Sequence, residues 1–504
     1  MLFNSAEFIF AFLPIALFGF FWIAGRFGNE VAILWLVIAS LFFYGWWDPS
    51  YLLIILMSML CNYFLGKHIY QQQSKLLLII GILGNLAVLG YFKYANFLVV
   101  NVALLSGSDW SIEKIVLPLA ISFFTFQQIA YLVDSYKKIT EEYRFVHYAL
   151  FVTFFPQLIA GPIVHHKEML PQFQSSSAFR ISSHHLAIGI GIFAIGLFKK
   201  TVIADGIAVY ANPVFNGADA GSSPDFLVAW SAALAYTFQI YFDFSGYSDM
   251  ALGLARMFGI VLPLNFYSPY KACSISEFWR RWHMTLSRFL RDYVYIPLGG
   301  SQRGSTRRYI NVGLTMLLGG LWHGAGWTFV LWGGLHGAFL MINHGWRSLK
   351  MRTVHSKGRT SQTIGQASHE SGGSTKNASV SQTLFRTIAA LSSHVLTLLV
   401  VVATWVVFRA ESLDAALSQL RSMFGMNGIA LPTQLQGALQ AHAPQALLEH
   451  IDFGSLFGNE LFAPATAMLW IALAGTIALA APNAHQLLIQ YRPVLENVRV
   501  INGI

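Results

Sequence analysis

The ten residues LGGLWHGAGW, at positions 318–327, place a titratable imidazole, His323, inside a long apolar stretch. A titratable group in the hydrocarbon region of a bilayer is costly, so it usually faces the protein interior or a water-filled cavity. Histidine is also the side chain best suited to act as a general base near neutral pH. Two interpretations of His323 follow: a structural histidine that is hydrogen-bonded to a neighbouring helix, or a catalytic base.

Further polar side chains occur in comparable settings. His336 lies in LWGGLHGAF and His283 lies in RRWHMTLS, while Asp243 and Asp249 interrupt the apolar segment YFDFSGYSDM. Small residues accompany His323 and His336, with glycines at positions 319, 320, 324, 326, 333 and 334. Glycines let helix backbones pack closely, and they equally leave room for a substrate beside an imidazole.

Other kinds of reactive site lack support in the sequence. There is no G-x-S-x-G motif, and neither Cys61 nor Cys273 has a plausible catalytic partner. The histidines show no H-E-x-x-H or comparable ligand spacing, so we predict neither a metal site nor a bound cofactor.

The composition indicates that membrane helices position these residues. The chain has 504 residues, of which 55% are hydrophobic and 11% are charged, whereas soluble domains carry about 25% charged residues. Mean hydropathy is +0.54. We predict an all-α polytopic membrane protein with about ten to twelve helices, some of them tilted or re-entrant. The clearest candidate spans are 7–25, 31–47, 50–66, 76–98, 115–135, 228–256, 386–408 and 464–482, and weaker ones lie near 146–164, 186–204, 309–322 and 325–345.

The net charge of +9 is better explained by cytoplasmic loops than by nucleic acid, because basic residues mark the cytoplasmic side of membrane proteins. Basic residues follow the first, third and fifth spans, at Arg26, Lys67, Lys75, Lys137, Lys138 and Arg144. This alternation places the N-terminus outside. We therefore expect the lipid bilayer, and not nucleic acid, as a partner.

Residues 263–308 are both basic and aromatic. Their basic residues are Lys271, Arg280, Arg281, Arg288, Arg291, Arg303, Arg307 and Arg308, opposed only by Glu277 and Asp292. From Ser274 to about Val294 the spacing of Phe278, Trp282, Leu286 and Phe289 or Leu290 predicts one amphipathic helix at the inner membrane surface, with Ser274 or Ser276 as its cap. The basic side chains could hold lipid headgroups or the phosphates of an acyl donor such as a coenzyme A thioester, and the sequence leaves both open.

Composition divides the chain into three parts. Residues 347–384 are rich in Ser, Gly, Thr, Gln and basic residues, which cannot bury enough apolar surface to order themselves. We predict a core at 1–346, a flexible cytoplasmic linker at 347–384, and C-terminal membrane helices at 385–504.

Several long motifs, in one order, resemble those of the membrane-bound O-acyltransferases, and within them the bacterial branch that contains the alginate O-acetylation membrane protein. The resemblance is dense from residue 2 to about 345 and continues at 405–412. The motifs are FNSAEFIFAFLP, FFYGWWDP, LGYFKYANF, LPLAISFFTFQQIAYLVDSY, FFPQLIAGPIVHHKEMLPQF, GLFKKTVIAD, QIYFDFSGYSDMALGLARMFGI, FWRRWHMTLSRFLRDYVYIPLGG, LGGLWHGAGWTFVLWGGLHG and WVVFRAES.

The resemblance implies a fold and a site. The fold would be a ring of tilted helices around a thinned core with a central tunnel. His323 matches the histidine taken as catalytic in the superfamily, and His283 matches its second functional position. We add six candidate substrate-binding residues: Asp249, Asp243, Trp282, Arg281, Trp322 and His336.

The implied activity is acetyl transfer from a cytoplasmic thioester, acetyl-coenzyme A, across the bacterial inner membrane for O-acetylation of an extracytoplasmic polysaccharide. A periplasmic SGNH-type transferase would be the partner that loads the polymer. Alginate or a similar exopolysaccharide is the first expectation for the acceptor, and peptidoglycan is the second. A transporter, or a scaffold of a polysaccharide secretion complex, is the alternative of a different class.

Overall fold

The computed structural model describes residues 1–140, 144–159, 161–364, 380–432, 436–442, 444, 452–454 and 464–488. Within these residues the regular secondary structure is helical apart from two three-residue strands. These strands, β1 (Ala430–Pro432) and β2 (Asp452–Gly454), pair in parallel with Ala430 opposite Asp452. The predicted all-α class is confirmed.

The first half of the chain forms α1 to α11. Their bounds are α1 (Leu13–Phe27), α2 (Asn29–Gly45), α3 (Ser50–Gln72), α4 (Lys75–Ser106), α5 (Ile121–Tyr136), α6 (Phe145–Thr153), α7 (Phe155–Leu158), α8 (His166–Met169), α9 (Ser183–Phe198), α10 (Asp205–Asp219) and α11 (Phe226–Met257). Wider π-helical turns, Phe8–Phe12 and Lys199–Ala204, precede α1 and join α9 to α10, and short 3₁₀ turns span Leu170–Gln174 and Ser176–Phe179.

The second half holds the residues expected to react. A 3₁₀ turn, Pro269–Lys271, leads into this part, and a π-helical turn, Arg291–Tyr295, follows α13. The helices are α12 (Ile275–Trp279), α13 (Met284–Leu290), α14 (Gly304–His323), α15 (Trp327–Ile364), α16 (Val380–Arg409), α17 (Leu413–Met423), α18 (Gln436–His442), α20 (Pro464–Leu479) and α21 (Ala484–Leu487).

Five described segments are long and apolar enough to cross a bilayer. They are Phe8–Phe27, Ser50–Gln72, Lys75–Ser106, Ser183–Asp219 and Arg386–Arg409, and the shorter apolar helices are Asn29–Gly45 and Thr466–Leu479. Large apolar side chains stay exposed along these segments, among them Phe18, Leu83 and Leu396, as expected of surfaces that face lipid. The protein is therefore a multi-pass membrane protein.

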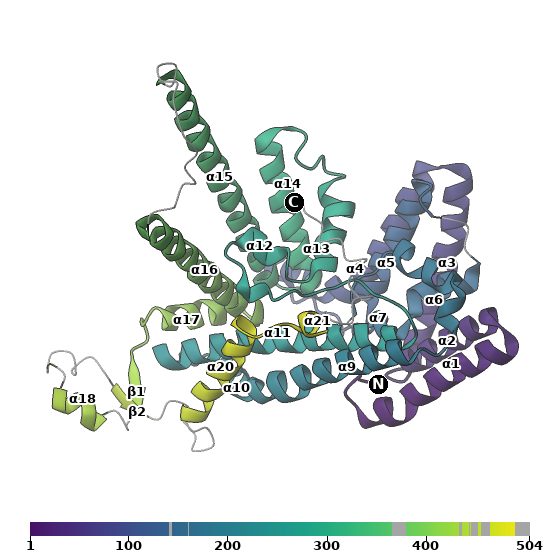
Figure 1. Ribbon diagram of the computed structural model, residues 1–504, viewed down its shortest axis with the longest axis horizontal. Helices are drawn as coiled ribbons and strands as arrows, with labels where there is room; N and C mark the ends of the chain where they lie inside the picture. Colours follow the sequence, from purple (N-terminus) through teal and green to yellow (C-terminus); the bar gives the residue numbers. More distant parts are fainter. Residues whose placement is uncertain are drawn as a thin grey trace, which may run out of the picture.

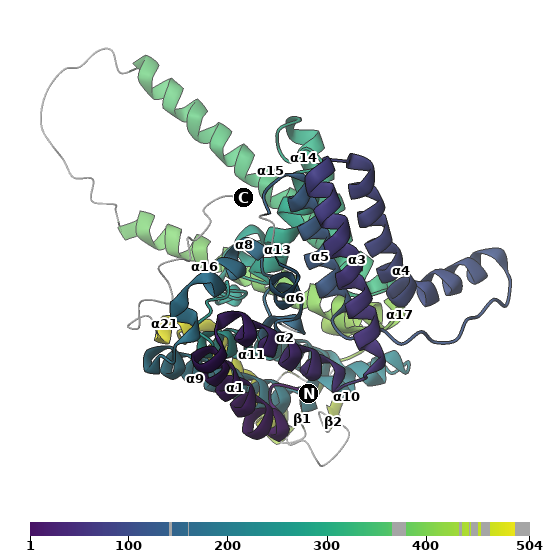
Figure 2. The same cartoon turned by 90° about the vertical axis from the view of Figure 1, so that its right-hand side faces the viewer.

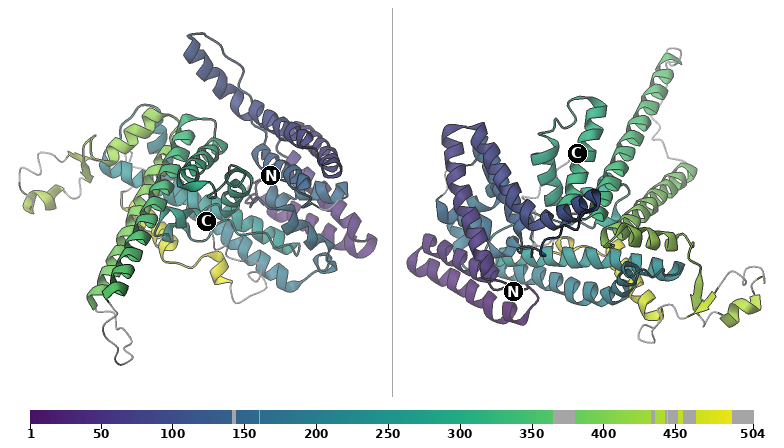
Figure 3. Two further views of the ribbon diagram at one scale, coloured as in Figure 1. Left: turned by 90° about the horizontal axis from the view of Figure 1, so that it is seen from above. Right: turned by 180° about the vertical axis from the view of Figure 1, so that it is seen from behind.

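Two directions of packing organise the helices. Helices α9 and α10 follow one another end to end along the long axis and together run beside α11, and α3, α4, α14 and α15 stand across them (Figures 1 and 3). Helix α11 belongs to two hydrophobic cores. Its first half packs with α10, α12, α15 and α16, and its second half packs with α1, α2 and α9. This long helix therefore joins the N-terminal helices to those that carry the histidines.

The basic segment does not form one continuous helix, so the prediction of a helix from Ser274 to about Val294 is wrong. Ser274 does cap the start of α12, accepting from the backbone of Glu277. The helix then breaks, because the Arg281 carbonyl accepts from the Tyr267 N–H and the Met284 N–H donates to the Asn265 carbonyl. The predicted apolar positions are nevertheless all buried: Phe278, Trp282, Leu286, Phe289 and Leu290.

The region predicted to be a linker is entered by helix from both sides. Helix α15 projects well beyond the body of the protein and continues through Ile364, and α16 begins at Val380 (Figure 2). The start of this region contains Arg347, Leu349 and Lys350, which are good helix formers that extend the preceding helix. Residues 365–379 lie outside the described residues, and a flexible linker there stays a prediction.

Helices α14 and α15 approach each other closely at two glycines. A Cβ atom added at Gly320 would lie 2.2 Å from the Phe329 carbonyl oxygen, and one added at Gly333 would lie 2.4 Å from that of Met316. Neither position has space for a methyl group without moving backbone. The glycines here therefore serve close packing, one of the two uses that the sequence allowed.

We expect Gly333→Ala to lower the stability of the protein by about 1–3 kcal/mol, the usual cost of overpacking, because it separates α14 from α15. The matched control is Gly334→Ala, whose added methyl would meet its nearest atom, a Leu317 methyl, at 3.5 Å. Thermal unfolding of the purified protein in detergent measures both. Equal melting temperatures for the two variants would show that the close approach is not a constraint.

Candidate functional site

His323 is the last residue of α14, and its imidazole lies among aromatic rings. Its ring centroid is 5.0 Å from that of Trp322, 5.2 Å from that of Trp332 and 5.3 Å from that of Phe408. A second imidazole, that of His283, lies 6.4 Å away. We call these five residues the histidine cluster. They come from α14, α15, α16 and the break between α12 and α13.

His283 is held in an unusual backbone conformation. Its φ of 43° and ψ of 52° are left-handed, which costs a residue with a side chain about 1–3 kcal/mol and recurs at functional sites. The side chain is 1% exposed. Its Nδ1 lies 3.0 Å from Oδ1 of Asn265, and the rings of Phe244 and Phe266 flank it.

His336 lies one ring away from His323. The Trp332 ring contacts both imidazoles, at 5.2 Å from His323 and 4.8 Å from His336. The indole N–H of Trp279 donates to Nδ1 of His336 at 3.2 Å. The sequence-predicted histidines thus meet in one region, with His283 and His323 as neighbours and His336 behind Trp332.

Two side chains from α4 bind the C-terminal end of α14. Lys93 Nζ donates to the Trp322 carbonyl and, at 3.2 Å, to Ser122 Oγ, while the Tyr94 hydroxyl donates to the Leu321 carbonyl at 2.8 Å. The last carbonyls of a helix lack partners within the helix, and a cation there also favours the helix dipole. Lys93 and Tyr94 therefore fix the end of the helix from which His323 projects.

Several buried nitrogen atoms of this region have no hydrogen-bond partner among the described residues. They are Nε2 of His283, Nδ2 of Asn265, Nε2 of His336, Nε1 of Trp322 and Nε1 of Trp332. A buried polar atom without a partner costs about 1–3 kcal/mol, so such atoms call for an explanation. Their concentration around His323 is what a site for a polar substrate group would show.

The predicted carboxylates are engaged elsewhere. Asp249 pairs with Lys199 at 2.8 Å and lies 3.4 Å from His485, and all three side chains are largely buried. Asp243 pairs with Lys200 at 2.7 Å and is half exposed. The structure does not bring these two carboxylates to the histidine cluster.

The remaining two predicted residues support the cluster from the α12 side. Trp282 is 2% exposed and packs against Trp405 of α16, with ring centroids 4.8 Å apart. Arg281 pairs with Glu277 at 2.7 Å and lies over the Tyr267 ring. Arg281, in the break after α12, therefore already has a carboxylate partner on that helix.

Sequence reasoning missed three contributors to the site. Trp332 and Phe408 complete the ring around His323, and Asn265 binds His283. The motif WVVFRAES contains Phe408 and was a signal for the fold, but nothing in its spacing tied it to a histidine some 80 residues earlier.

A second polar cluster, also missed, joins α5 to α8. Ligand-type atoms of Asp134, His165 and His166 lie within 4.8 Å of one another, and two histidines with a carboxylate form a set that Zn²⁺ accepts. Asp134 Oδ2, however, already accepts from the Tyr293 hydroxyl at 2.9 Å and lies 2.6 Å from His165 Nε2. Burial lowers the pKa of His166 to about 4. We interpret this cluster as a hydrogen-bonded junction.

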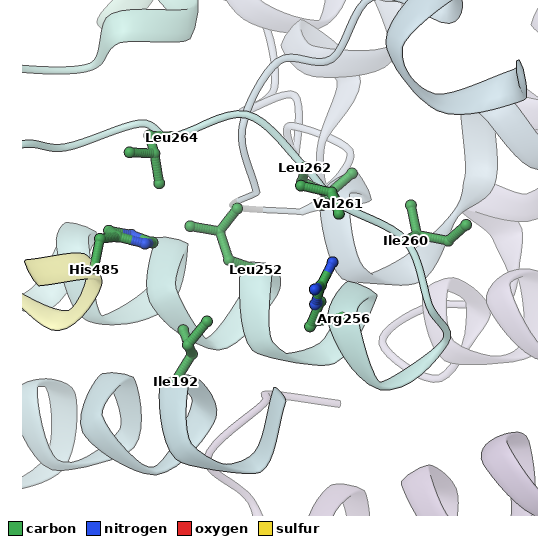
Figure 4. A pocket seen from close by; sticks show the side chains of 8 residues that line it. All are labelled: Ile192, Leu252, Arg256, Ile260, Val261, Leu262, Leu264 and His485. Carbon is green, nitrogen blue, oxygen red and sulfur yellow. The ribbon is translucent and has the colours of Figure 1, made fainter. Parts of the chain in front are cut away.

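A small cavity lies apart from the histidine cluster. It has a volume of about 10 Å³, room for about one water molecule. Figure 4 shows Arg256 at its edge, with the side chain directed toward the loop of Ile260 to Leu262, and His485 at the other end. No residue of the histidine cluster lines it, so we do not assign it to the reaction.

The chain is similar in sequence to known proteins of one family. Residues 41–367 match the family described as "MBOAT, membrane-bound O-acyltransferase family". The chain is 43% identical over 461 residues to a protein named peptidoglycan O-acetyltransferase from Helicobacter pylori, covering 86% of this chain and 81% of the relative.

Two further proteins are similar to this chain. A protein from Pseudomonas aeruginosa named "Probable alginate O-acetylase AlgI" is 40% identical over 435 residues, covering 84% of this chain and 75% of the relative. A protein named teichoic acid D-alanyltransferase, from Streptococcus thermophilus, is 28% identical over 246 residues, covering 47% of this chain and 59% of the relative.

We expect Lys93→Met to lower the stability of the protein by about 1.5–3 kcal/mol, because a hydrogen bond from a charged donor is lost and the Trp322 carbonyl is left unpaired. Lys93→Arg retains a cation and is the conservative control. Exposed Lys75, at the start of α4, offers the same substitution away from α14. Melting temperatures in detergent measure all three, and a Lys93→Met protein as stable as Lys75→Met would contradict the capping role.

Proposed function

Because the chain belongs to the membrane-bound O-acyltransferase family, we propose that it transfers acetyl groups from a cytoplasmic thioester, across the inner membrane, for O-acetylation of an extracytoplasmic polysaccharide. The observation that carries this proposal is the position of His323, a general-base side chain enclosed by aromatic rings at the end of a helix. The names of two relatives, both O-acetylating proteins of extracellular polymers, support the class of reaction.

The proposed chemistry is direct transfer. An acceptor hydroxyl attacks the thioester carbonyl while His323 takes its proton, so that a C–O bond forms, the C–S bond breaks, and the proton passes to the departing thiolate. The surrounding rings of Trp322, Trp332 and Phe408 exclude bulk water, which protects the thioester from hydrolysis. The unpartnered indole N–H groups of Trp322 and Trp332 are suitable donors for the carbonyl oxygen as it gains negative charge.

The donor is proposed to be acetyl-coenzyme A, held through its phosphates by the basic segment. Ion pairs within the protein reduce the number of arginines that remain available to bind phosphate. Three of them already bind carboxylates: Arg281 binds Glu277, Arg288 binds Glu168 and Arg291 binds Asp292. Arg303 and Arg307 are exposed at the start of α14, the helix whose other end carries His323. Arginine suits phosphate recognition by paired hydrogen bonds.

The final acceptor is proposed to be peptidoglycan or alginate, or a similar exopolysaccharide, and a periplasmic SGNH-type transferase is proposed to be the immediate acceptor, whose hydroxyl receives the acetyl group and passes it to the polymer. The identities of 43% and 40% to relatives named for the two polymers are too close to separate them. The experiment therefore measures bound acetate on both polymers.

The test is polymer-bound acetate in a deletion strain complemented with the wild type, His323→Ala or His68→Ala. We expect His323→Ala to insert normally and to lower acetate by about 100-fold or more, the usual loss when a general base is removed. His68, an exposed histidine bonded to the Phe64 carbonyl, is the matched control and should restore acetate fully.

Base-released acetate is measured on purified peptidoglycan and on secreted polysaccharide, and membrane levels of each variant are compared by immunoblot. The polymer that carries acetate names the acceptor. Full acetate on either polymer with His323→Ala would exclude the catalytic role and favour a scaffold or transporter.

A further inference from the structure

We infer that Asn265 is a positioning residue that selects the tautomer of His283, with the proton on Nδ1 and a free electron pair on Nε2, so that His283 accepts a hydrogen bond beside His323. The inference rests on the proposed function and assigns to His283 one role within it. It is carried by a chain of hydrogen bonds that links two of the sequence motifs to Asn265, which lies between motifs.

The chain begins at the backbone of the AGPIV segment. The N–H of Ile163 donates to Thr285 Oγ1 at 3.0 Å, so this hydroxyl must send its own proton elsewhere. Its other partner is Oδ1 of Asn265, at 2.9 Å. The backbone N–H of Thr285 also points to the same oxygen, at 3.4 Å.

The backbone N–H of Thr285 fixes the orientation of the Asn265 amide, because an N–H can only donate whereas the hydroxyl can also accept. Reversing the amide would set its NH₂ group against this N–H, so the atom facing Thr285 is the oxygen, and Nδ2 of Asn265 has no partner among the described residues. That oxygen lies 3.0 Å from Nδ1 of His283. An acceptor there requires Nδ1 to carry the proton, and the neutral ring then has its electron pair on Nε2.

The backbone holds the pair of residues together. The Met284 N–H donates to the Asn265 carbonyl at 2.9 Å, and the Tyr267 N–H donates to the Arg281 carbonyl at the same distance. These bonds run across the break between α12 and α13, where His283 has its left-handed conformation. The break therefore places the imidazole of His283 beside the amide of Asn265.

His336 is held in the opposite tautomer. An indole N–H only donates, so the bond from Trp279 to Nδ1 of His336, at 3.2 Å, places the His336 proton on Nε2. The two buried histidines near His323 therefore differ in chemistry. His283 offers an acceptor at its unpartnered Nε2, and His336 offers a donor at its own.

This difference limits what His283 can do. A neutral ring with a free pair on Nε2 cannot polarise a thioester carbonyl, because that needs a donor. It can accept a hydrogen bond from the acceptor hydroxyl or from a water. The ring centroids of His283 and His323 are 6.4 Å apart, a separation that suits one bridging oxygen better than a direct bond.

The tautomer can be measured without any assay of function. The protein, which has 16 histidines, is labelled with ¹⁵N-histidine and reconstituted in lipid for solid-state NMR at pH 8. The signals of His283 are those lost in His283→Gln. We expect a protonated Nδ1 and an unprotonated, pyridine-type Nε2. A pyridine-type Nδ1 would overturn the inference, whatever the outcome of the acetylation experiment.

The consequence for activity is tested with Asn265→Asp. A carboxylate keeps the acceptor for Nδ1–H but stabilises the imidazolium, so a proton occupies Nε2 at higher pH. The acid limb of the activity profile should then move upward by about one pH unit or more. Phe244, Phe266, Trp322 and His323 are the rings around His283, and only His323 among them can change charge.

The profile is recorded in membranes from the complemented strain as transfer of label from radioactive acetyl-coenzyme A to polymer, each variant relative to its own maximum. The matched control is Asn62→Asp, which places a carboxylate at a buried asparagine paired with Asn85 between α3 and α4. An unchanged profile in Asn265→Asp, or an equal shift in Asn62→Asp, would exclude the positioning role. Absence of label with the wild type would instead exclude acetyl-coenzyme A as donor, and the NMR result would stand unaffected.

Discussion

The near-contact of α14 and α15 is the constraint on which the rest of the structure depends. At Gly320 and Gly333 the backbones touch without side chains between them, and this distance sets where the end of α14 lies relative to the face of α15. His323 is on the first of these helices and Trp332 and His336 are on the second. The absence of a Cβ atom at Gly320 and Gly333 thus sets the spacing of these three rings.

A second constraint is electrostatic. The site collects imidazole and indole nitrogens in a region of low polarity, where each unpaired polar atom is expensive. The protein limits this cost through Asn265, Trp279 and Lys93, which bind His283, His336 and the Trp322 carbonyl. The second ring nitrogen of each of these histidines, and the indole nitrogens of Trp322 and Trp332, have no partner in the part of the chain that the structure describes. Such an arrangement favours a bound polar group over an empty site.

Much of this could be foreseen from the sequence, and the misses have physical causes. Hydropathy predicted the helical membrane class. The motif LWHG indicated His323 as a candidate site residue, because a titratable ring in an apolar segment is rare enough to be informative. The helix break at His283 was not foreseen, since side-chain periodicity continues through it while the backbone pairs with Asn265 and Tyr267. The pairing of Asp249 with Lys199 could not be foreseen, because a buried carboxylate looks alike in sequence whether it faces a substrate or a lysine.

The last rings of the site come from late in the chain. Phe408 and Trp405 lie on α16, beyond residue 367, where the family match ends. During synthesis, α14 and α15 emerge from the ribosome well before α16, so one side of the imidazole is open until that helix inserts. An unfinished chain therefore carries His323 without the aromatic rings of α16 beside it. Under the proposed function, the order of translation delays the appearance of a complete site until α16 has been made and inserted.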